Sequence, residues 1–172
     1  MITLVLGGAR SGKSAVAEAL AARHGAPITY IATMDPSGDP EMEARVAAHR
    51  ERRDSSWGTV EAGNDLAGLL ASVRGTVLID SLGPWLAGPG AGSGPDREQR
   101  TDALCAALRK RGGDTVVVSD EVGLAVHPSS AVGRDFRDAL GQLNHAVSAI
   151  ADKTYLVVAG RALELPPAGP PL

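Results

Sequence analysis

The chain has 172 residues, of which 44% are hydrophobic and 3% aromatic, and its formal net charge at pH 7 is −3. This length suits one domain with a sizeable core, and a core so poor in aromatic residues must be built from Val, Leu, Ile and Ala, which favours an α/β domain over a β-sandwich. The small negative charge gives no reason to expect general binding to nucleic acids or membranes, and leaves room only for a local basic patch.

Strands and helices alternate along the predicted chain. In chain order, the apolar patterns and helix-boundary signals predict a strand at 2–6, a helix at 13–23, a strand at 28–32, a helix at 41–53, a strand at 59–61, a helix at 64–73, a strand at 76–79, a helix at 97–111, a strand at 115–118, a helix at 134–151 and a strand at 154–158. Loops are predicted at 35–40, 87–95 and 119–130, and the proline-rich tail at 166–172 is expected to be disordered. The alternation predicts one three-layer domain at 1–165, with a mainly parallel central sheet covered by helices on both faces.

Two absences narrow the class of protein further. The single cysteine, Cys105, excludes an intramolecular disulfide framework and a multi-cysteine metal site, and we expect it to be a small buried apolar residue. The apolar run at 2–6 is far too short for a signal peptide, and no later segment approaches the roughly 20 apolar residues of a membrane span. We therefore expect a cytoplasmic enzyme with no stable membrane insertion.

The segment at 7–14 reads Gly-Gly-Ala-Arg-Ser-Gly-Lys-Ser and matches the Walker A pattern of glycine, four residues, then Gly-Lys-Ser, between a predicted strand and a predicted helix. The glycines let successive backbone N–H groups point at phosphate oxygens, and the helix N-terminus adds a favourable dipole. Lys13 is predicted to reach the terminal phosphates of a nucleoside triphosphate, and the hydroxyl of Ser14 is predicted to ligate Mg²⁺. The nucleotide-binding residues of this P-loop are predicted to be Gly7, Gly8, Ala9, Arg10, Ser11, Gly12, Lys13 and Ser14.

Carboxylates end two of the other predicted strands. Asp80 follows the apolar strand at 76–79, as a Walker B aspartate would, and could hold the metal opposite Ser14. Asp120 and Glu121 follow the strand at 115–118 and compete for the same role. In a parallel sheet both strand ends open on the side of the P-loop, so either pair could line the site.

The predicted helix at 41–53 carries a histidine among arginines. His49 shares one helical stripe with Met42 and Val46, which should face the core. Nearby positive charge favours the neutral imidazole, which is nucleophilic, while guanidiniums could stabilise a phosphate under attack. The alternative is a solvated, salt-bridged surface helix with an incidental histidine. The neighbouring arginines are Arg45, Arg50, Arg52 and Arg53.

The other three histidines are weaker candidates. His24 is expected to end a helix, because Gly25 follows it. His127 lies in a predicted loop, where a role in the site and simple exposure are equally compatible with the sequence. His145 lies inside the predicted helix at 134–151 and is most simply a packing or surface residue.

The sequence also resembles a known family along nearly its whole length, the bifunctional adenosylcobinamide kinase / adenosylcobinamide-phosphate guanylyltransferases of cobalamin biosynthesis. A P-loop alone would say little, but the resemblance rests on an ordered set of motifs. The motifs are the P-loop at 7–14, Tyr30-Ile31-Ala32-Thr33, Glu41-Met42 with Arg45, His49-Arg50 with Arg53 and Trp57, Glu61, Leu78-Ile79-Asp80 with Trp85, Glu121-Val122-Gly123 with Pro128, and Arg134-Asp135-Phe136-Arg137-Asp138 with Gly141 and Asn144.

This resemblance implies a P-loop NTPase-like fold and two reactions. The first phosphorylates the aminopropanol hydroxyl of adenosylcobinamide with ATP or GTP, and the second moves GMP from GTP onto that phosphate through a GMP–histidine intermediate. The family's nucleophilic histidine matches His49, which favours the catalytic interpretation of that helix over the incidental one. The resemblance also implies a homo-oligomer, typically a trimer. The Mg²⁺ expected at Ser14 would be the cofactor, with GTP or ATP as the substrate.

The same matching extends the nucleotide site beyond the P-loop. A carboxylate at Glu61 makes chemical sense near guanine, because it can accept hydrogen bonds from both the N1–H and the 2-amino group, a donor pair that adenine lacks. That argument supports GTP over ATP in the transferase step without placing Glu61 at the base. The residues that the resemblance adds to the nucleotide site are Thr33, Met34, Asp35, Arg50, Glu51, Arg52, Arg53, Glu61 and Asp80.

The sequence departs from the family pattern in one loop. Asp120 replaces the usual asparagine, Ala125 replaces the usual second glycine, and His127 precedes Pro128. This loop is expected to touch cobinamide, so the departures bear on the kinase reaction more than on the nucleotide site. Two other functions remain open: a P-loop kinase for another small metabolite without covalent GMP chemistry, and a nucleotide-binding regulator without catalysis.

Overall fold

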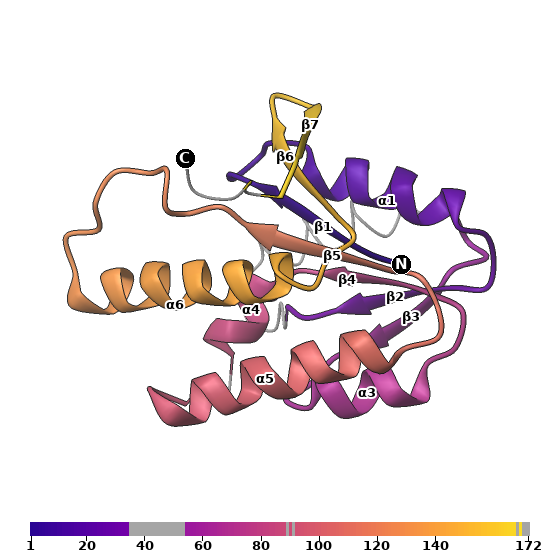
Figure 1. Ribbon diagram of the computed structural model, residues 1–172, viewed down its shortest axis with the longest axis horizontal. Coiled ribbons are helices and arrows are strands. Elements are labelled where there is room, and N and C mark those ends of the chain that lie inside the picture. Colours follow the sequence, from indigo (N-terminus) through magenta and orange to yellow (C-terminus); the bar gives the residue numbers. More distant parts are fainter. Residues whose placement is uncertain (35–53, 89, 91, 168, 170–172) are drawn as a thin grey trace.

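A computed structural model describes residues 1–34, 54–88, 90, 92–167 and 169 of the chain, and these residues form a seven-stranded sheet flanked by helices (Figure 1). The strands are β1 (Ile2–Gly7), β2 (Ile28–Ala32), β3 (Gly58–Glu61), β4 (Thr76–Asp80), β5 (Thr115–Asp120), β6 (Lys153–Val158) and β7 (Arg161–Leu165). The helices are α1 (Lys13–Arg23), α3 (Leu66–Ser72), α4 (Leu82–Ala87), α5 (Pro95–Lys110) and α6 (Ala131–Ser148). The strand order is β3-β2-β4-β5-β1-β6-β7, and every neighbouring pair is parallel except β6 and β7.

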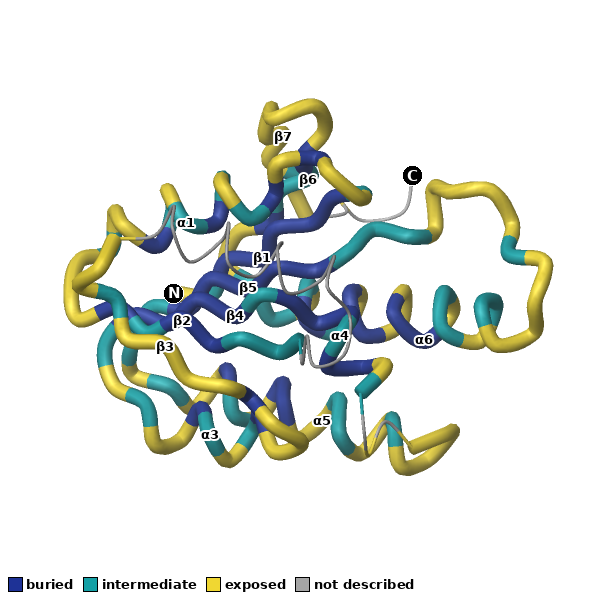
Figure 2. Tube along the Cα trace, turned by 180° about the vertical axis from the view of Figure 1, so that it is seen from behind, coloured by how far each residue is buried: buried dark blue, intermediate teal, exposed yellow. Residues whose placement is uncertain are grey.

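Alternate residues of the central strands face two separate apolar clusters. Leu4 and Leu6 of β1 pack with residues of α3, α4, α5 and α6, whereas Val5 packs with Ala17 and Ala21 of α1. Strands buried on both faces read as continuous apolar runs, which is why β1, β4 and β5 are recognisable from sequence. The tube view shows these strands as the buried centre of the molecule, with exposed residues on the outer turns of the helices (Figure 2). The three layers confirm the predicted α/β fold with helices on both faces.

The structure adds two elements that the sequence did not predict. Strand β7 pairs with β6 through a two-residue turn at Ala159 and Gly160, both with positive φ, in the register Val158 opposite Arg161. Asparagine or aspartate with glycine is the usual signal for such a turn, and an alanine in its first position hides the hairpin. Helix α4 was missed because it has only six residues and contains a Gly-Pro pair.

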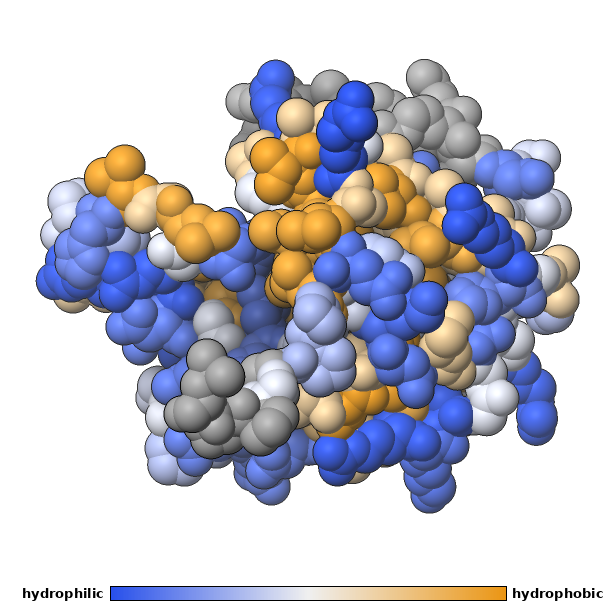
Figure 3. Space-filling view, turned by 45° about the horizontal axis from the view of Figure 1, so that its top comes forward, coloured by the Kyte–Doolittle hydropathy of each residue, from blue (hydrophilic) through white to orange (hydrophobic). Residues whose placement is uncertain are grey.

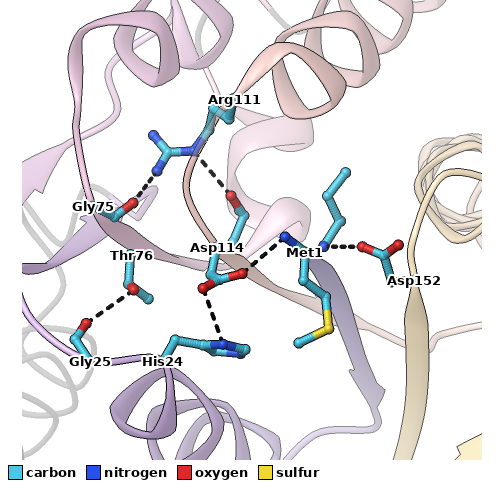
Figure 4. A network of polar contacts seen from close by, with 10 residues as sticks. Met1, His24, Gly25, Gly75, Thr76, Arg111, Asp114 and Asp152 are labelled. Atoms are coloured by element: carbon cyan, nitrogen blue, oxygen red, sulfur yellow. Dashed lines mark hydrogen bonds and ion pairs between the residues drawn. The ribbon is translucent and has the colours of Figure 1, made fainter.

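A network of polar contacts connects several elements at the amino-terminal ends of the parallel strands (Figure 4). The Arg111 guanidinium donates to the backbone carbonyls of Leu70, Val73 and Gly75, and to the hydroxyl of Thr115. It therefore links the end of α5 to the segment that leads into β4.

Asp114, in the same network, accepts from the amine of Met1 at 2.9 Å and lies 3.3 Å from Nδ1 of His24. The hydrogen bond from that amine lowers the pKa of the Asp114 carboxyl. His24 is the C-cap of α1, which confirms its predicted place at a helix end.

Within the described ranges, no helix combines the length and the apolar character needed to cross a bilayer.

Candidate functional site

The carboxyl ends of three neighbouring strands bring the predicted site residues to one edge of the sheet. Strand β5 lies between β1 and β4, and its last residue, Asp120, is in register with Gly7 at the end of β1. Asp80 ends β4, one strand further from the P-loop. The strand order therefore places Asp120, rather than Asp80, directly beside the P-loop.

The P-loop leads from Gly7 of β1 to Lys13, the first residue of α1, and its backbone adopts a positive φ at Gly12, a conformation that favours glycine. Gly12 has a φ of +91°, and a Cβ there would lie 3.2 Å from the Cα of Gly160. The N–H of Gly160 donates to the carbonyl of Ser11 at 2.8 Å, so the β6–β7 turn braces the loop. Helix α1 has neither a side-chain cap nor an acidic residue in its first turn. Its first N–H groups can therefore bind an anion, as a phosphate site requires.

Lys13 is the charged centre of this loop, and it is only 5% exposed. Its Nζ donates to the carbonyl of Gly8 at 3.3 Å and lies 2.7 Å from Oδ1 of Asp120. A buried ammonium is costly unless it is paired, and this ion pair satisfies the requirement. The lysine predicted to reach phosphates is therefore bound to a carboxylate of the neighbouring strand.

Asp120 is held in place by its surroundings. A Cβ at Gly83 of α4 would meet Oδ2 of Asp120 at 2.8 Å, so the glycine leaves the room that the carboxylate occupies. The backbone carbonyl of Asp120 accepts from Nδ2 of Asn144 on α6 at 3.0 Å. The next residue, Glu121, donates its backbone N–H to the carbonyl of Gly7 at 3.0 Å. The start of the loop after β5 is thus fixed to both the P-loop and α6.

Asp80 has a different environment. The hydroxyl of Tyr30 donates to Oδ2 of Asp80 at 3.2 Å. Thr33, just beyond β2, donates its hydroxyl to the carbonyl of Ser81 at 2.5 Å and accepts from the N–H of Ser81 at 2.8 Å. The structure therefore brings the predicted nucleotide residues Thr33 and Asp80 together, with Met34 next in the chain. Ser81 and Gly83 belong to the same edge but carry no sequence signal that would have identified them.

Oxygen donors suited to a hard divalent cation line this edge. Among the described residues, no group of three or more His, Cys, Asp or Glu side chains gathers around one point. A Mg²⁺ ion bound to a nucleotide needs only one or two carboxylates, because phosphates and water supply its other ligands. The hydroxyl of Ser14 with the carboxylate of Asp80 or Asp120 is a donor set of this kind, so the residues present fit the ion.

Glu61 also lies at the carboxyl ends of the parallel strands, but on β3, the outermost strand on the side away from the P-loop. It ends β3, opposite Ala32 of β2, and its side chain is exposed. Strand β3 is four positions from β1 in the sheet, and at about 4.8 Å per strand Glu61 is roughly 19 Å from the P-loop strand. Glu61 is therefore too far from the P-loop strand to share a phosphate with it.

Several predictions concern residues outside the described part of the chain, namely Asp35, His49, Arg50, Glu51, Arg52 and Arg53. Of the remaining candidates, His127 is exposed and its Nδ1 lies 2.7 Å from the guanidinium of Arg137. His145 is exposed on α6, and Cys105 is buried, as expected. Burial raises the pKa of the Cys105 thiol.

Apolar side chains mark the part of the molecule where the segment after β5 leads into α6. In the space-filling view, apolar side chains lie on the lobe that projects at the left (Figure 3). In the ribbon view, the part that projects on this side is the segment between β5 and α6 with the first turns of α6. The exposed large hydrophobic residues here are Leu124, Val126 and Val132, with exposed fractions of 82%, 93% and 79%. Leu124 and Val126 lie in the same loop as Ala125 and His127, whereas Val132 belongs to α6.

Comparison with known proteins gives one consistent match. The family model described as cobinamide kinase / cobinamide phosphate guanyltransferase matches residues 3–165. The chain is 39% identical to the bifunctional adenosylcobalamin biosynthesis protein CobP of Pseudomonas aeruginosa over 176 residues, which cover 100% of both chains. It is 35% identical to the bifunctional adenosylcobalamin biosynthesis protein CobU of Escherichia coli over 182 residues, covering 96% of this chain and 99% of that one.

The chain also aligns with solved structures of low sequence identity. The flagellar accessory protein FlaH of Methanocaldococcus jannaschii aligns with a TM-score of 0.47 and 12% identity, covering 95% of this chain and 75% of that one.

Proposed function

Because the chain belongs to the cobinamide kinase / cobinamide phosphate guanyltransferase family, we propose that it performs both reactions at the edge of the sheet where the P-loop lies. The enzyme is a kinase and a guanylyltransferase of cobalamin biosynthesis. It phosphorylates the aminopropanol hydroxyl of adenosylcobinamide with ATP or GTP and then converts the product to adenosylcobinamide-GDP with GTP. The observation that carries this proposal is that the P-loop lysine, Lys13, is buried at the N-terminus of α1, which has no side-chain cap.

The kinase reaction needs a site that neutralises the terminal phosphates. The substrate hydroxyl oxygen attacks the γ-phosphorus and its proton is released to water, while the bond from that phosphorus to the β,γ-bridging oxygen breaks and the nucleoside diphosphate leaves. The ammonium of Lys13 and the first N–H groups of α1 stabilise the negative charge on these phosphates. When bound, Mg²⁺ would add further neutralising charge, with Ser14 and Asp80 as the residues that hold it.

The guanylyl transfer needs a nucleophile at the α-phosphate, and we assign this role to His49. A neutral imidazole nitrogen attacks the α-phosphorus of GTP and pyrophosphate leaves. A phosphate oxygen of adenosylcobinamide phosphate then attacks the same phosphorus and releases the imidazole. Support comes from the family match and from the arginines at 50, 52 and 53, whose charge favours the neutral ring.

The nucleotide and partner assignments follow the same reasoning. We propose that Glu61 contributes to guanine recognition and that the segment after β2 contacts the nucleotide, as the contacts of Thr33 with Ser81 beside Asp80 support. The remaining proposed nucleotide contacts are Met34, Asp35, Arg50, Glu51, Arg52 and Arg53. The enzyme is proposed to work in the cytoplasm as a homo-oligomer, with a trimer as the form that the family resemblance implies, and to bind no nucleic acid.

Labelling with GTP that carries radioactive phosphorus at the α-position tests the covalent step. The protein should take up label as an adduct that acid cleaves and alkali does not, because a phosphorus–nitrogen bond has this stability. His49→Ala should abolish the labelling, whereas His145→Ala, which removes an exposed histidine of α6, should retain it. Wild-type protein that takes up no label would show that His49 is not a nucleophile.

A further inference from the structure

We propose that Asp120 sets the affinity of this enzyme for nucleotides, because its carboxylate competes with the terminal phosphates for Lys13. The inference rests on the proposed function only in requiring that polyphosphates bind at Lys13. Among the described residues, the Lys13 ammonium contacts the carbonyl of Gly8 at 3.3 Å and Oδ1 of Asp120 at 2.7 Å. The second is an ion pair at the distance of a strong charge-assisted hydrogen bond.

The position of Asp120 makes the competition unavoidable. Asp120 is in register with Gly7, so its carboxylate lies at the point where the P-loop begins. Its second oxygen lies against Gly83, and Asn144 binds its backbone carbonyl, so the strand end that carries the carboxylate is held beside Lys13. A phosphate that reaches Lys13 must therefore replace Asp120 or share the ammonium with it.

Either outcome weakens binding. Replacement breaks a charge-assisted hydrogen bond of a lysine that is only 5% exposed. Sharing keeps a carboxylate within a few ångströms of a polyanion, and like charges that close repel strongly in a partly buried site. An asparagine has the same shape and its Oδ1 still accepts from Lys13, but the bond is weaker because the acceptor carries no charge.

The competition also specifies the class of ligand that it affects. The P-loop lysine binds the β- and γ-phosphates, so the effect belongs to ligands that carry a phosphate beyond the α-position. GTP, GDP and inorganic pyrophosphate are in this class, and GMP is not. Pyrophosphate is also the product that the guanylyl transfer releases, so Asp120 would favour its departure.

Isothermal titration calorimetry of the full-length protein with GTP, inorganic pyrophosphate and GMP tests the inference. Asp120→Asn should bind GTP and pyrophosphate about tenfold more tightly than wild type, with GMP binding unchanged. The empty variant should melt about 2–4 °C lower, because Lys13 loses its counter-charge. A variant that melts at a lower temperature but binds polyphosphates more tightly would show this competition, because a merely structural role would lower both stability and affinity.

Glu164→Gln is the control variant. It removes one carboxylate charge from β7, outside the proposed site, and keeps an oxygen for the hydroxyl of Tyr155, which Glu164 binds at 3.1 Å. It leaves the Lys13–Asp120 pair intact, so polyphosphate affinity should change less than about twofold. If Asp120→Asn does not fold, Asp120→Ser removes the charge and retains the backbone contact to Asn144, and the same gain is expected.

Three results would overturn the inference. Weaker or unchanged GTP binding in Asp120→Asn would mean that the carboxylate assists the nucleotide, directly or through a metal. An equal gain for GMP, or for Glu164→Gln, would mean that the effect comes from general electrostatics and not from competition for Lys13. A wild-type protein that binds neither GTP nor pyrophosphate would refute both this inference and the proposed function, whereas one that binds them but leaves adenosylcobinamide unchanged would refute the function alone.

Discussion

Replacing Gly12 by alanine should damage both the stability of the protein and its nucleotide site. The φ of Gly12 is +91°, and a left-handed backbone costs a residue with a Cβ roughly 1–2 kcal/mol. The added Cβ would also lie 3.2 Å from the Cα of Gly160, so the loop or the β6–β7 turn must shift. We expect a loss of about 1–3 kcal/mol in the free energy of unfolding, measured by urea denaturation.

The same shift should misalign the N–H groups that face the phosphates. Hydrogen bonds to charged groups contribute about 1.5–3 kcal/mol each, so the loss of one should weaken GTP binding at least tenfold, measured by calorimetry. Gly8→Ala is the control for stability, since Gly8 has no positive φ and a Cβ there meets no atom of the described residues within 4 Å. Its free energy of unfolding should change by less than about 0.5 kcal/mol. A Gly12→Ala protein with wild-type GTP affinity, or an equal stability loss in Gly8→Ala, would refute the reasoning.

Two further predictions concern the core and the amino-terminal ends of the parallel strands. Arg111→Met should lower the free energy of unfolding by about 2–4 kcal/mol and leave GTP affinity unchanged, because three backbone carbonyls far from the site lose their donor. Arg109→Met, at an exposed position, is the control. An equal loss of stability in both variants would show that these hydrogen bonds do not stabilise the protein. Cys105 should resist a thiol reagent in the native protein at neutral pH and react after unfolding, because burial raises its pKa and little thiolate forms; rapid native labelling would contradict this.

The strands that carry the site were predictable because each is buried on both faces. Strands β1, β4 and β5 read as apolar runs that end in Gly7, Asp80 and Asp120, and the Walker A pattern has enough fixed positions to identify a phosphate site. The elements that escaped prediction are those whose local signals conflict with their structure. Strand β7 follows a turn that begins with alanine, and α4 is a short helix containing Gly83 and a proline.

The order of the strands could not be predicted, and it determines which carboxylate meets the P-loop lysine. Both Asp80 and Asp120 end apolar strands, and their side chains are chemically equal in sequence. Insertion of β5 between β1 and β4 places Asp120 at 2.7 Å from Lys13. That choice depends on how the helices pack on the two faces of the sheet, a tertiary property with no local signal. The role of His49 stays a prediction that rests on the family and on its arginine neighbours.

One assay tests the central claim, that a single chain performs both reactions. The protein is incubated with adenosylcobinamide, GTP and Mg²⁺, and the phosphate ester is separated from the GDP ester over time. The account predicts that the phosphate forms first and is converted to the GDP ester, and that His49→Ala stops at the phosphate. Accumulation of the phosphate alone by the wild-type protein, or the absence of both products, would contradict it.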